Sequence, residues 1–373
     1  MLYLDNSATT QILPEVKEAM LPYLLEEFGN PSSKYYGLAQ HAKEAVETAR
    51  KHVAQLLGCE TDEVIFTSGA TESNNFILKG VAHYYKDKGK HIVTSKVEHP
   101  SILEACNFLE ENGYKVTYLD VDQFGRINTE QLLAAIQQDQ PILVSIMWGN
   151  NELGSLNSIA EIAQICKEHK VFFHTDATQV VGKVSVDLSE IEGINFLSCS
   201  SHKFHGPKGV GVTVIRKDEL GLPIQITPLL HGGGQERDIR SGTLAVHNIV
   251  GMGKAAELAY TNLEVNIQAL EQLETHLTNI LKNKFQNHIH FNNDIKDKIP
   301  GIISVVFKGI NNETLVRSLA PVAAVSTGSA CSSSKPSHVL QAIGLTMDEV
   351  RSTIRFSLSP IISLAELEIF NTL

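Results

Sequence analysis

Helical and extended patterns of apolar residues alternate along the chain from about residue 38 to residue 216. Apolar residues recur at helical spacing over 39–56, and Gly58 follows as a C-terminal stop. Further helix starts are indicated at Thr71, at Pro100 and at the capping box that begins with Ser158. Short, continuously apolar runs typical of buried strands lie at 64–66, 92–93, 142–144, 171–173 and 210–215. This alternation predicts a mainly parallel sheet covered by helices on both faces.

The pattern changes after about residue 245. A long amphipathic stretch from Val246 to Phe285 is followed by an apolar run at 302–307, a helix start after Asn311 and a second apolar run at 354–358. The serine of a further capping box, Ser363, indicates one more helix start. We therefore expect a second, smaller α+β domain that a long helix joins to the first.

The length of the chain agrees with two domains, because 373 residues exceed one ordinary hydrophobic core. We expect the fold class to be α/β, with a large domain at 13–255. The small domain is expected to comprise 1–12 and 256–373, and to include a loop at about 323–337.

Charge and hydropathy exclude several classes of partner. A formal net charge of -11 argues against direct binding to nucleic acid or to a membrane surface, since such proteins present dense basic faces. No segment approaches the length of about 18 uncharged apolar residues that a membrane span needs. The first residues, MLYLDNSATT, lack a basic run followed by an apolar stretch. The sequence therefore predicts a cytoplasmic protein.

The five cysteines are far apart and never form a Cys-x-x-Cys pair, so we expect neither a metal site nor a disulfide framework. Four of them lie in periodic apolar segments, where a buried and inert thiol is expected. These four are Cys59, Cys106, Cys166 and Cys199. Cys331 differs, because it lies in the run Ser-Thr-Gly-Ser-Ala-Cys-Ser-Ser-Ser-Lys-Pro, which is typical of a loop.

The strongest candidate for chemistry is Lys203, which follows a strand end among small hydroxyl residues and glycines at 198–209. Alone it would be read as a surface lysine, but lysine is also the residue that forms Schiff bases. Upstream, Asp176 ends an apolar strand, where a buried carboxylate could hold a pyridine nitrogen protonated or could cap a following helix. The small-residue turn at 67–73 could direct backbone N–H groups at a phosphate. Ligands of open α/β sheets bind at the carboxyl ends of the strands, where all three features lie.

In this order, the phosphate turn, the acid and the lysine resemble fold-type I enzymes that use pyridoxal 5'-phosphate (PLP), in the class V aminotransferase group. The resemblance sharpens to cysteine desulfurases of the NifS/IscS type, and it spans nearly the whole chain. The matching stretches are 4–10, 29–33, 68–74, 98–99, 150–154, 176–179, 200–203, 240–243, 329–331 and 354–357. The span between Cys331 and Pro336 is slightly shorter than in that family and carries Lys335.

The resemblance implies a role for each matching residue. Lys203 would hold PLP as a Schiff base, His99 would stack on its ring, Asp176 would pair with the pyridine nitrogen, and Gln179 with the phenolic oxygen. In a homodimer, Thr243 would reach the phosphate of the other subunit. The other implied cofactor contacts are Ala70, Thr71, Ser200, His202 and Asn151. The implied substrate contacts are Asn30, Asn151 and Arg355, whose guanidinium fork suits an amino-acid carboxylate.

By the same resemblance, the chain would convert L-cysteine to L-alanine and hold the sulfur as a persulfide on Cys331 for an acceptor protein. The catalytic residues would be Cys331, Lys203 and His99. Iron–sulfur scaffolds, tRNA-thiolation enzymes and DNA-sulfur modification systems are all open as acceptors. A selenocysteine lyase or an aminotransferase is the alternative within the fold, although an aminotransferase has no use for a loop cysteine.

Two alternatives come from other classes. A dinucleotide-dependent oxidoreductase needs Gly-x-Gly-x-x-Gly between an early strand and a helix, and neither glycine-rich run, 206–211 or 232–234, opens such a unit. A non-catalytic binding protein derived from the fold would have lost Lys203 or Cys331, and both are present.

Overall fold

The computed structural model describes residues 1–328 and 335–372. The largest sheet among these residues has seven strands. Four neighbouring pairs are parallel, and β8 is antiparallel to both of its neighbours. In spatial order the strands are β2 (Val64–Thr67), β8 (Gly211–Ile215), β7 (Phe196–Ser200), β6 (Phe172–Asp176), β5 (Leu143–Ser145), β3 (His91–Ser95) and β4 (Lys115–Leu119). The predicted mainly parallel sheet is therefore confirmed.

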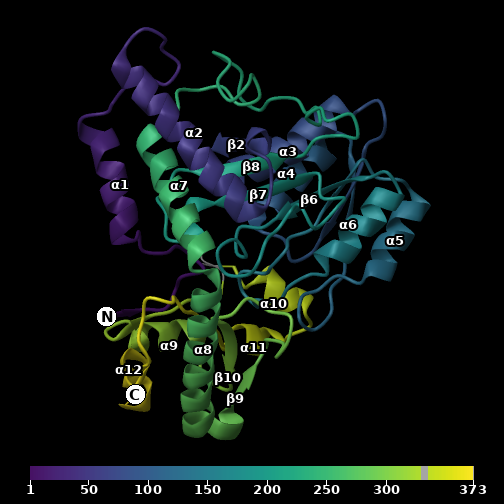
Figure 1. Cartoon of the computed structure of the whole chain (residues 1–373). Helices are drawn as coiled ribbons and strands as arrows, with labels where there is room; N and C mark the ends of the chain where they lie inside the picture. Colours follow the sequence, from purple (N-terminus) through teal and green to yellow (C-terminus); the bar gives the residue numbers. More distant parts are fainter. Residues whose placement is uncertain (329–334, 373) are drawn as a thin grey trace.

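Helices cover both faces of this sheet because alternate strand residues point to opposite sides. On β2, Val64 and Phe66 belong to one apolar cluster and Ile65 to another. The first cluster is completed by α1 (Pro14–Leu25), α2 (Gly37–Leu57), α5 (Thr129–Gln138), α6 (Ile159–Glu168) and α7 (Val246–Thr261). The second is completed by α3 (Ala70–Tyr84) and α4 (Pro100–Glu111). Figure 1 shows α1, α2 and α7 side by side against the sheet.

The carboxyl-terminal part forms a separate cluster around a three-stranded antiparallel sheet, with β10 in its centre. In Figure 1 this part lies below the large sheet, with α8 along it. Its strands are β9 (Ile289–Phe291), β10 (Ile302–Phe307) and β12 (Thr353–Ser357). Its helices are α8 (Leu263–Phe285), α9 (Asn312–Leu319), α10 (His338–Ala342), α11 (Met347–Val350), α12 (Leu364–Leu367) and α13 (Ile369–Thr372). The domain boundaries given above stay a prediction.

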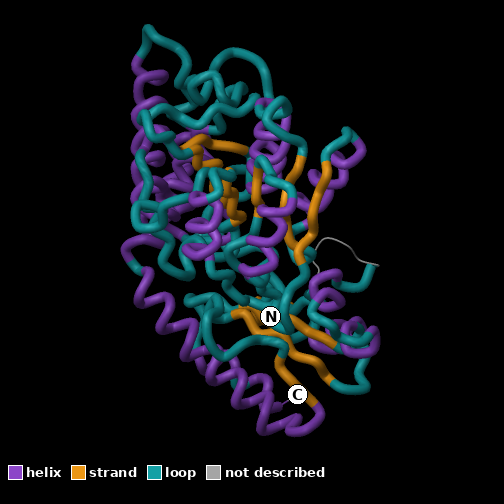
Figure 2. The backbone as a smooth tube through the Cα atoms, turned by 90° about the vertical axis from the view of Figure 1, so that its right-hand side faces the viewer, coloured by secondary structure: helices purple, strands orange, loops and turns teal. Residues whose placement is uncertain are grey.

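The amino terminus is built into this carboxyl-terminal part. Strand β1 (Leu2–Tyr3) pairs in parallel with β11 (Ala323–Ala324), and the N–H of Asn6 donates to the carbonyl of Ser357 at 3.2 Å. Figure 2 shows the N-terminus between the large sheet and the region that ends at the C-terminus. The first ten residues therefore connect the two parts of the molecule.

Several predicted helix ends are confirmed, and two details are wrong. Helix α2 ends at Gly58, whose φ of 61° is left-handed. Ser363 forms the predicted capping box at the start of α12. Ser158 precedes α6, but its side chain makes no capping hydrogen bond, so the predicted box is not formed. The single helix expected over 246–285 is two helices, which meet at Asn262 with φ -107° and ψ 13°.

Within the described residues, none of the helices combines the length and the apolar character that crossing a bilayer requires. Short 3-10 turns occur at η1 (Thr61–Glu63), η2 (Ser201–Lys203) and η3 (Gln286–His288). The second of these turns carries Lys203 directly after β7.

Candidate active site

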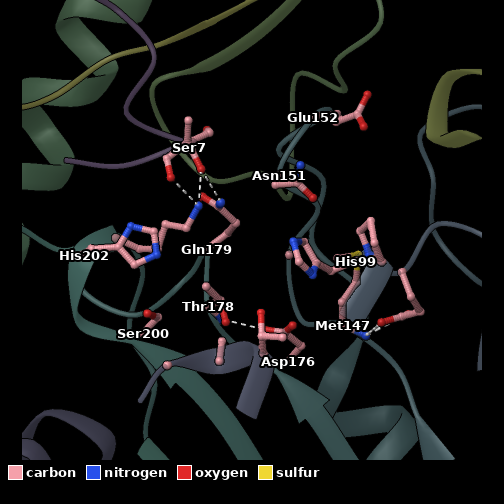
Figure 3. Close-up of a pocket in the computed structure, with 18 of the residues that line it drawn as sticks. Ser7, His99, Met147, Asn151, Glu152, Asp176, Thr178, Gln179, Ser200 and His202 are labelled. Carbon is pink, nitrogen blue, oxygen red and sulfur yellow. Dashed lines mark hydrogen bonds between the residues drawn. The ribbon is translucent and has the colours of Figure 1, made fainter. Parts of the chain in front are cut away.

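The carboxyl ends of the central strands border a cavity of about 420 Å³. Strands β6 and β7 end there with Asp176 and Ser200. The turn after β2 lies at the same edge, because β2 and β7 both run antiparallel to β8. Ten of the residues expected at the site line the cavity: Ala70, Thr71, His99, Asn151, Asp176, Gln179, Ser200, His202, Lys203 and Arg355. Figure 3 labels six of them: His99, Asn151, Asp176, Gln179, Ser200 and His202.

Asp176 is fixed by two hydrogen bonds and is only 5% exposed. One carboxylate oxygen accepts from Nδ2 of Asn74 at 2.7 Å, and the other accepts from the N–H of Thr178 at 2.9 Å. No helix begins behind Asp176; residues 178–180 form a turn, so the carboxylate caps a turn and the helix-cap alternative is wrong. Burial lowers the pKa of His174, on the same strand, to about 4, which leaves this imidazole neutral at pH 7.

The turn between β2 and α3 lies against the end of β7. Gly69 precedes α3 with φ 149°, and a Cβ at this position would lie 3.6 Å from Oγ of Ser200. The first N–H groups of α3 have no partner inside the helix. Burial, with the positive charges of Lys203 and Lys208, lowers the pKa of His202 to about 4, so its ring is neutral. Together these groups supply N–H and O–H donors suited to an anion.

Lys203 extends from the end of β7 toward the amino-terminal segment. Its Nζ donates to the carbonyls of Ser7 at 2.5 Å and Ala8 at 2.9 Å. Nε2 of Gln179 donates to the same Ser7 carbonyl at 2.9 Å, and Nζ of Lys183 donates to Oε1 of Gln179 at 3.1 Å. Burial and the charge of Lys203 lower the pKa of Lys183 to about 7. Three elements far apart in sequence therefore set the position of the Lys203 amine.

His99 has both a structural and a site role. It is the N-cap of α4, where Nδ1 accepts from the N–H of Ser101 at 3.1 Å. The ring also lines the cavity, on the same side as Asp176 (Figure 3). Because Nδ1 accepts this bond, the proton of a neutral ring lies on Nε2. Burial lowers the pKa of His99, which favours the neutral ring.

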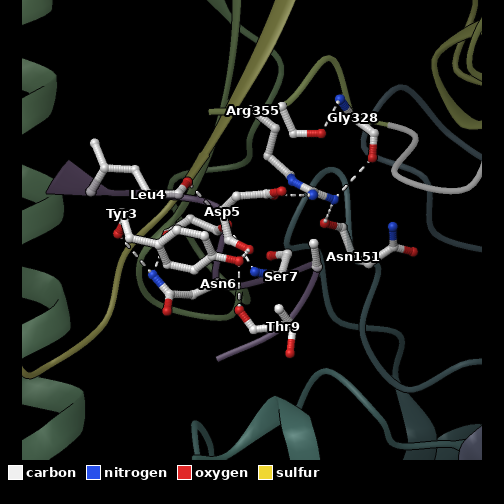
Figure 4. A network of polar contacts seen from close by, with 12 residues as sticks. Tyr3, Leu4, Asp5, Asn6, Ser7, Thr9, Asn151, Gly328 and Arg355 are labelled. Atoms are coloured by element: carbon white, nitrogen blue, oxygen red, sulfur yellow. Dashed lines mark hydrogen bonds and ion pairs between the residues drawn. The ribbon is translucent and has the colours of Figure 1, made fainter. Parts of the chain in front are cut away.

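Arg355 is a buried arginine in the cavity wall, with 1% of its surface exposed. Its Nη1 donates to the carbonyls of Asn151 and Gly328, both at 2.9 Å, and its Nη2 donates to Oδ1 of Asp5 at 2.7 Å (Figure 4). Its buried Nε has no hydrogen-bond partner among the described residues. A guanidinium held in this way presents a fixed positive charge to the cavity.

Two of the expected residues, Thr243 and Asn30, are absent from the lining of the cavity. Both are exposed, and Cys331 lies outside the described residues. Of the four other cysteines, Cys106, Cys166 and Cys199 are buried as expected, whereas Cys59 is partly exposed. Within residues 1–328 and 335–372, no group of three or more His, Cys, Asp or Glu side chains could hold a metal ion.

The cavity is also lined by residues for which no individual contact was predicted, although Ser68, Gly69 and Glu72 belong to the predicted phosphate turn. The full set is Ser7, Ala8, Ser68, Gly69, Glu72, Glu98, Pro100, Met147, Gly149, Glu152, Thr178, Lys208, Gly209 and His338. Ser7 and Glu152 lie in motifs that carried the resemblance, 4–10 and 150–154, so the signal was there but was not assigned to a function. His338 carried no such signal.

Comparison with known proteins agrees with this geometry. Residues 2–370 match the family model described as aminotransferase class-V. Over 360 residues, the chain is 44% identical to the cysteine desulfurase IscS of Dictyoglomus turgidum, which covers 96% of this chain and 89% of the relative. The chain belongs to the cysteine desulfurases of the class-V aminotransferase family.

Solved structures agree with this assignment. A NifS-like protein superposes with a TM-score of 0.91 at 38% identity, over 100% of this chain and 97% of that one. A structure described as SspA in complex with cysteine gives a TM-score of 0.84 at 36% identity, over 96% of this chain and 99% of that one. The cysteine desulfurase therefore has the fold-type I architecture that the motif order predicted.

Proposed function

We propose that this cysteine desulfurase uses PLP in the described cavity to convert L-cysteine to L-alanine. The sulfur is held as a persulfide on Cys331 and passed to an acceptor protein. The observation that carries the proposal is that ten residues expected from separate motifs line one cavity at the carboxyl ends of the strands. The similar protein whose structure is described with cysteine bound supports the choice of substrate.

The cavity fits PLP in its chemistry. Three residues of the lining, Ser7, Thr178 and Arg355, each have a buried polar side-chain atom (Oγ, Oγ1 and Nε) that has no hydrogen-bond partner among the described residues. Such atoms cost free energy unless a polar ligand satisfies them. The turn before α3, with Ser200 and His202, suits the phosphate. When bound, PLP supplies an electron sink for the substrate carbon atoms.

Lys203 and Asp176 have distinct roles in this proposal. Lys203 would hold the cofactor through Nζ, and its free amine would move the proton at the substrate Cα. The carbonyls of Ser7 and Ala8 give that amine a defined position when it is released. Asp176 would pair with the pyridine nitrogen, where a carboxylate favours the protonated ring. Its bonds to Asn74 and Thr178 fix the direction of the carboxylate.

The substrate carboxylate lies against Arg355, whose charge is partly shared with Asp5 at 2.7 Å. The neutral ring of His99 would stack on the cofactor, and its Nε2 could exchange a proton with a group in the cavity. Arg355 and Asp176 are themselves shielded from bulk water, with 1% and 5% of their surfaces exposed. This shielding strengthens their charge interactions inside the cavity.

The sulfur step needs no external oxidant. The thiolate of Cys331 attacks the substrate sulfur, an S–S bond forms and the bond from sulfur to Cβ breaks. The electron pair of the broken bond stays with the carbon skeleton, which takes up protons and leaves as alanine. The balance is one cysteine substrate and one enzyme thiol in, and one alanine and one enzyme persulfide out.

The proposal includes a cytoplasmic homodimer in which Thr243 completes the phosphate site of the partner subunit. Exposure of Thr243 outside the cavity lining supports this role, because an exposed residue is available to a second subunit. It also includes the division into 13–255 and 1–12 with 256–373. The cluster around β10 includes Leu4 and supports the placement of the first residues, whereas the cluster of the large sheet extends past 255 to Ala259 in α7. Mixing inactive Lys203→Ala and Thr243→Ala chains should restore part of the activity if the sites are shared.

The proposal is tested by labelling and by a cysteine substitution. Borohydride reduction and peptide mapping should leave the pyridoxyl group on Lys203, and a label on Lys208 would contradict the assignment. Cys331→Ser should keep the visible absorbance of bound PLP but lose alanine formation from L-cysteine by orders of magnitude, since a hydroxyl is a far weaker nucleophile. The matched control, Cys59→Ser, should keep its activity. Normal alanine formation by Cys331→Ser would refute the persulfide role.

A further inference from the structure

Glu152 is a buried acid in the cavity wall to which the proposed chemistry gives no task. It lies between β5 and α6, is 3% exposed and follows Asn151 in the chain. Burial raises its pKa, and the bond from Ser337 and the charges of Arg355 and His338 oppose this effect. Burying a carboxyl group costs free energy of folding unless its oxygens are paired, so the contacts of Glu152 determine that cost.

One contact of Glu152 is with the residue that starts α10. Oγ of Ser337 donates to Oε2 of Glu152 at 2.6 Å, and the same Oγ accepts from the N–H of Leu340 at 3.1 Å. The single hydroxyl proton of Ser337 is therefore used by Glu152, while its lone pair caps the helix. The carboxylate and the helix start are tied together.

The second contact is with Gly328. A Cβ on this residue would lie 2.7 Å from Oε2 of Glu152, so the carboxylate packs directly against the glycine backbone, whose φ is 102°. Nη1 of Arg355 donates to the carbonyls of Gly328 and of Asn151, both at 2.9 Å, which joins the same two segments a second time (Figure 4). Gly328 is therefore held against the segment that carries Glu152.

Gly328 and Ser337 border the stretch of sequence that contains Cys331, and both contact one carboxylate oxygen. We propose that Glu152 is a positioning residue, which sets the separation of the two ends of this stretch and so the reach of the Cys331 thiolate. The inference rests on the proposed function, because it assumes that Cys331 is the sulfur acceptor. Fixing both ends of a short segment restricts the positions of a group between them, and small misplacements of a reacting group cost up to about 100-fold in rate.

Three variants, Glu152→Ala, Ser337→Ala and Gly328→Ala, disturb these contacts, and two further variants are controls. Glu152→Ala removes the acceptor, and Ser337→Ala removes the donor while keeping the carboxylate. Glu152→Gln keeps the side-chain volume and an acceptor oxygen for Ser337. Gly344→Ala is the matched backbone control for Gly328→Ala: both glycines have left-handed φ, 88° and 102°, but a Cβ at Gly344 meets nothing within 4 Å.

The first measurement does not depend on turnover. The rate of alkylation by iodoacetamide is followed for each cysteine by peptide mass spectrometry in the holoenzyme. Glu152→Ala, Ser337→Ala and Gly328→Ala should change the rate at Cys331 at least about threefold, whereas Glu152→Gln and Gly344→Ala should not. Cys106, Cys166 and Cys199 are buried and serve as internal controls, so their rates should stay unchanged in every variant.

The second measurement separates binding from sulfur transfer. In Ser337→Ala, L-cysteine should produce the absorbance change of bound PLP at a concentration close to that of the wild type, while alanine formation falls about 10- to 100-fold. Unchanged alkylation of Cys331 in Ser337→Ala overturns the inference, as does an equal loss in Glu152→Gln and Glu152→Ala. If the wild-type protein makes no alanine, the proposed function is refuted. The alkylation rates still test whether the contacts of Glu152 with Ser337 and Gly328 position Cys331.

Discussion

Replacing Arg50 by Met should destabilise the protein strongly, because it breaks a buried ion pair on one side only. Arg50 and Glu236 are 4% and 7% exposed. Nη1 and Nη2 of Arg50 donate to the two carboxylate oxygens at 2.9 and 2.8 Å, and Nη1 also donates to the carbonyl of Val64 at 2.7 Å. Without Arg50, the carboxylate keeps a bond from the N–H of Phe66 at 2.8 Å.

The magnitude follows from the charge that remains. A buried charge that loses its partner costs about 3–5 kcal/mol of unfolding free energy. Met retains most of the apolar stem that packs near Phe66, where the guanidinium lies 4.7 Å from the ring centroid, so lost packing adds little. The double variant Arg50→Met with Glu236→Gln should lose less than the sum of the single variants, because neither charge is then left alone.

Urea unfolding of the holoenzyme, followed by the fluorescence of the single tryptophan, Trp148, measures this loss. Lys115→Met is the matched control, since the side chains of Lys115 and Asp139 are 55% and 49% exposed and their ion pair should contribute nothing measurable. A loss below about 1 kcal/mol for Arg50→Met would refute the reasoning, because it would mean that the Glu236 carboxylate tolerates isolation.

Three further predictions concern the site. Burial raises the pKa of Glu98 to about 8, so between about pH 4.5 and 8 the folded state binds a proton that the unfolded state has lost. Stability should fall as pH rises through that window, by up to about 1.4 kcal/mol per pH unit relative to Glu98→Gln in paired urea titrations. Gly211→Ala would place a Cβ 2.6 Å from Cα of Gly69, at an overpacking cost of about 1–3 kcal/mol, so the affinity for PLP, measured by titration, should fall. In the control Gly37→Ala, the added Cβ meets nothing within 4 Å, and PLP should bind normally. Asp176→Asn should retain PLP but lose about 10- to 100-fold in alanine formation, because a neutral amide replaces a charge-assisted bond of about 1.5–3 kcal/mol.

The central sheet could be predicted because its strands carry local signals. Runs such as 64–66 and 171–173 are apolar on both faces, and Gly58 supplies the left-handed turn that ends α2. The break at Asn262 could not be predicted, since apolar residues continue at helical spacing on both sides of it. The capping box at Ser158 was also predicted wrongly. The sequence has a suitable serine, but in the folded chain, where its backbone ψ is 68°, its side chain makes no capping hydrogen bond.

The site could be predicted wherever a motif placed its residues next to a strand end, as for Asp176 and Ser200. Contacts that depend on tertiary structure left no such signal. The carbonyl of Ser7 meets Nζ of Lys203 across 196 positions, and Ser337 meets Glu152 across 185. Backbone carbonyls have no identity in a sequence, and a buried acid such as Glu152 resembles any surface glutamate until the chain is folded.

The amino-terminal segment also constrains when the enzyme can become active during its synthesis. Asp5 pairs with Arg355 across 350 positions, so this contact waits until 350 further residues have been made. At about 5–20 residues per second, a ribosome needs roughly 20–70 s to cover that distance. The large sheet can form in the meantime, but Lys203 and Arg355 share one wall only after β12 has emerged. Assembly of the active site is thus a late event, and a nascent chain stopped before residue 355 has no complete substrate site.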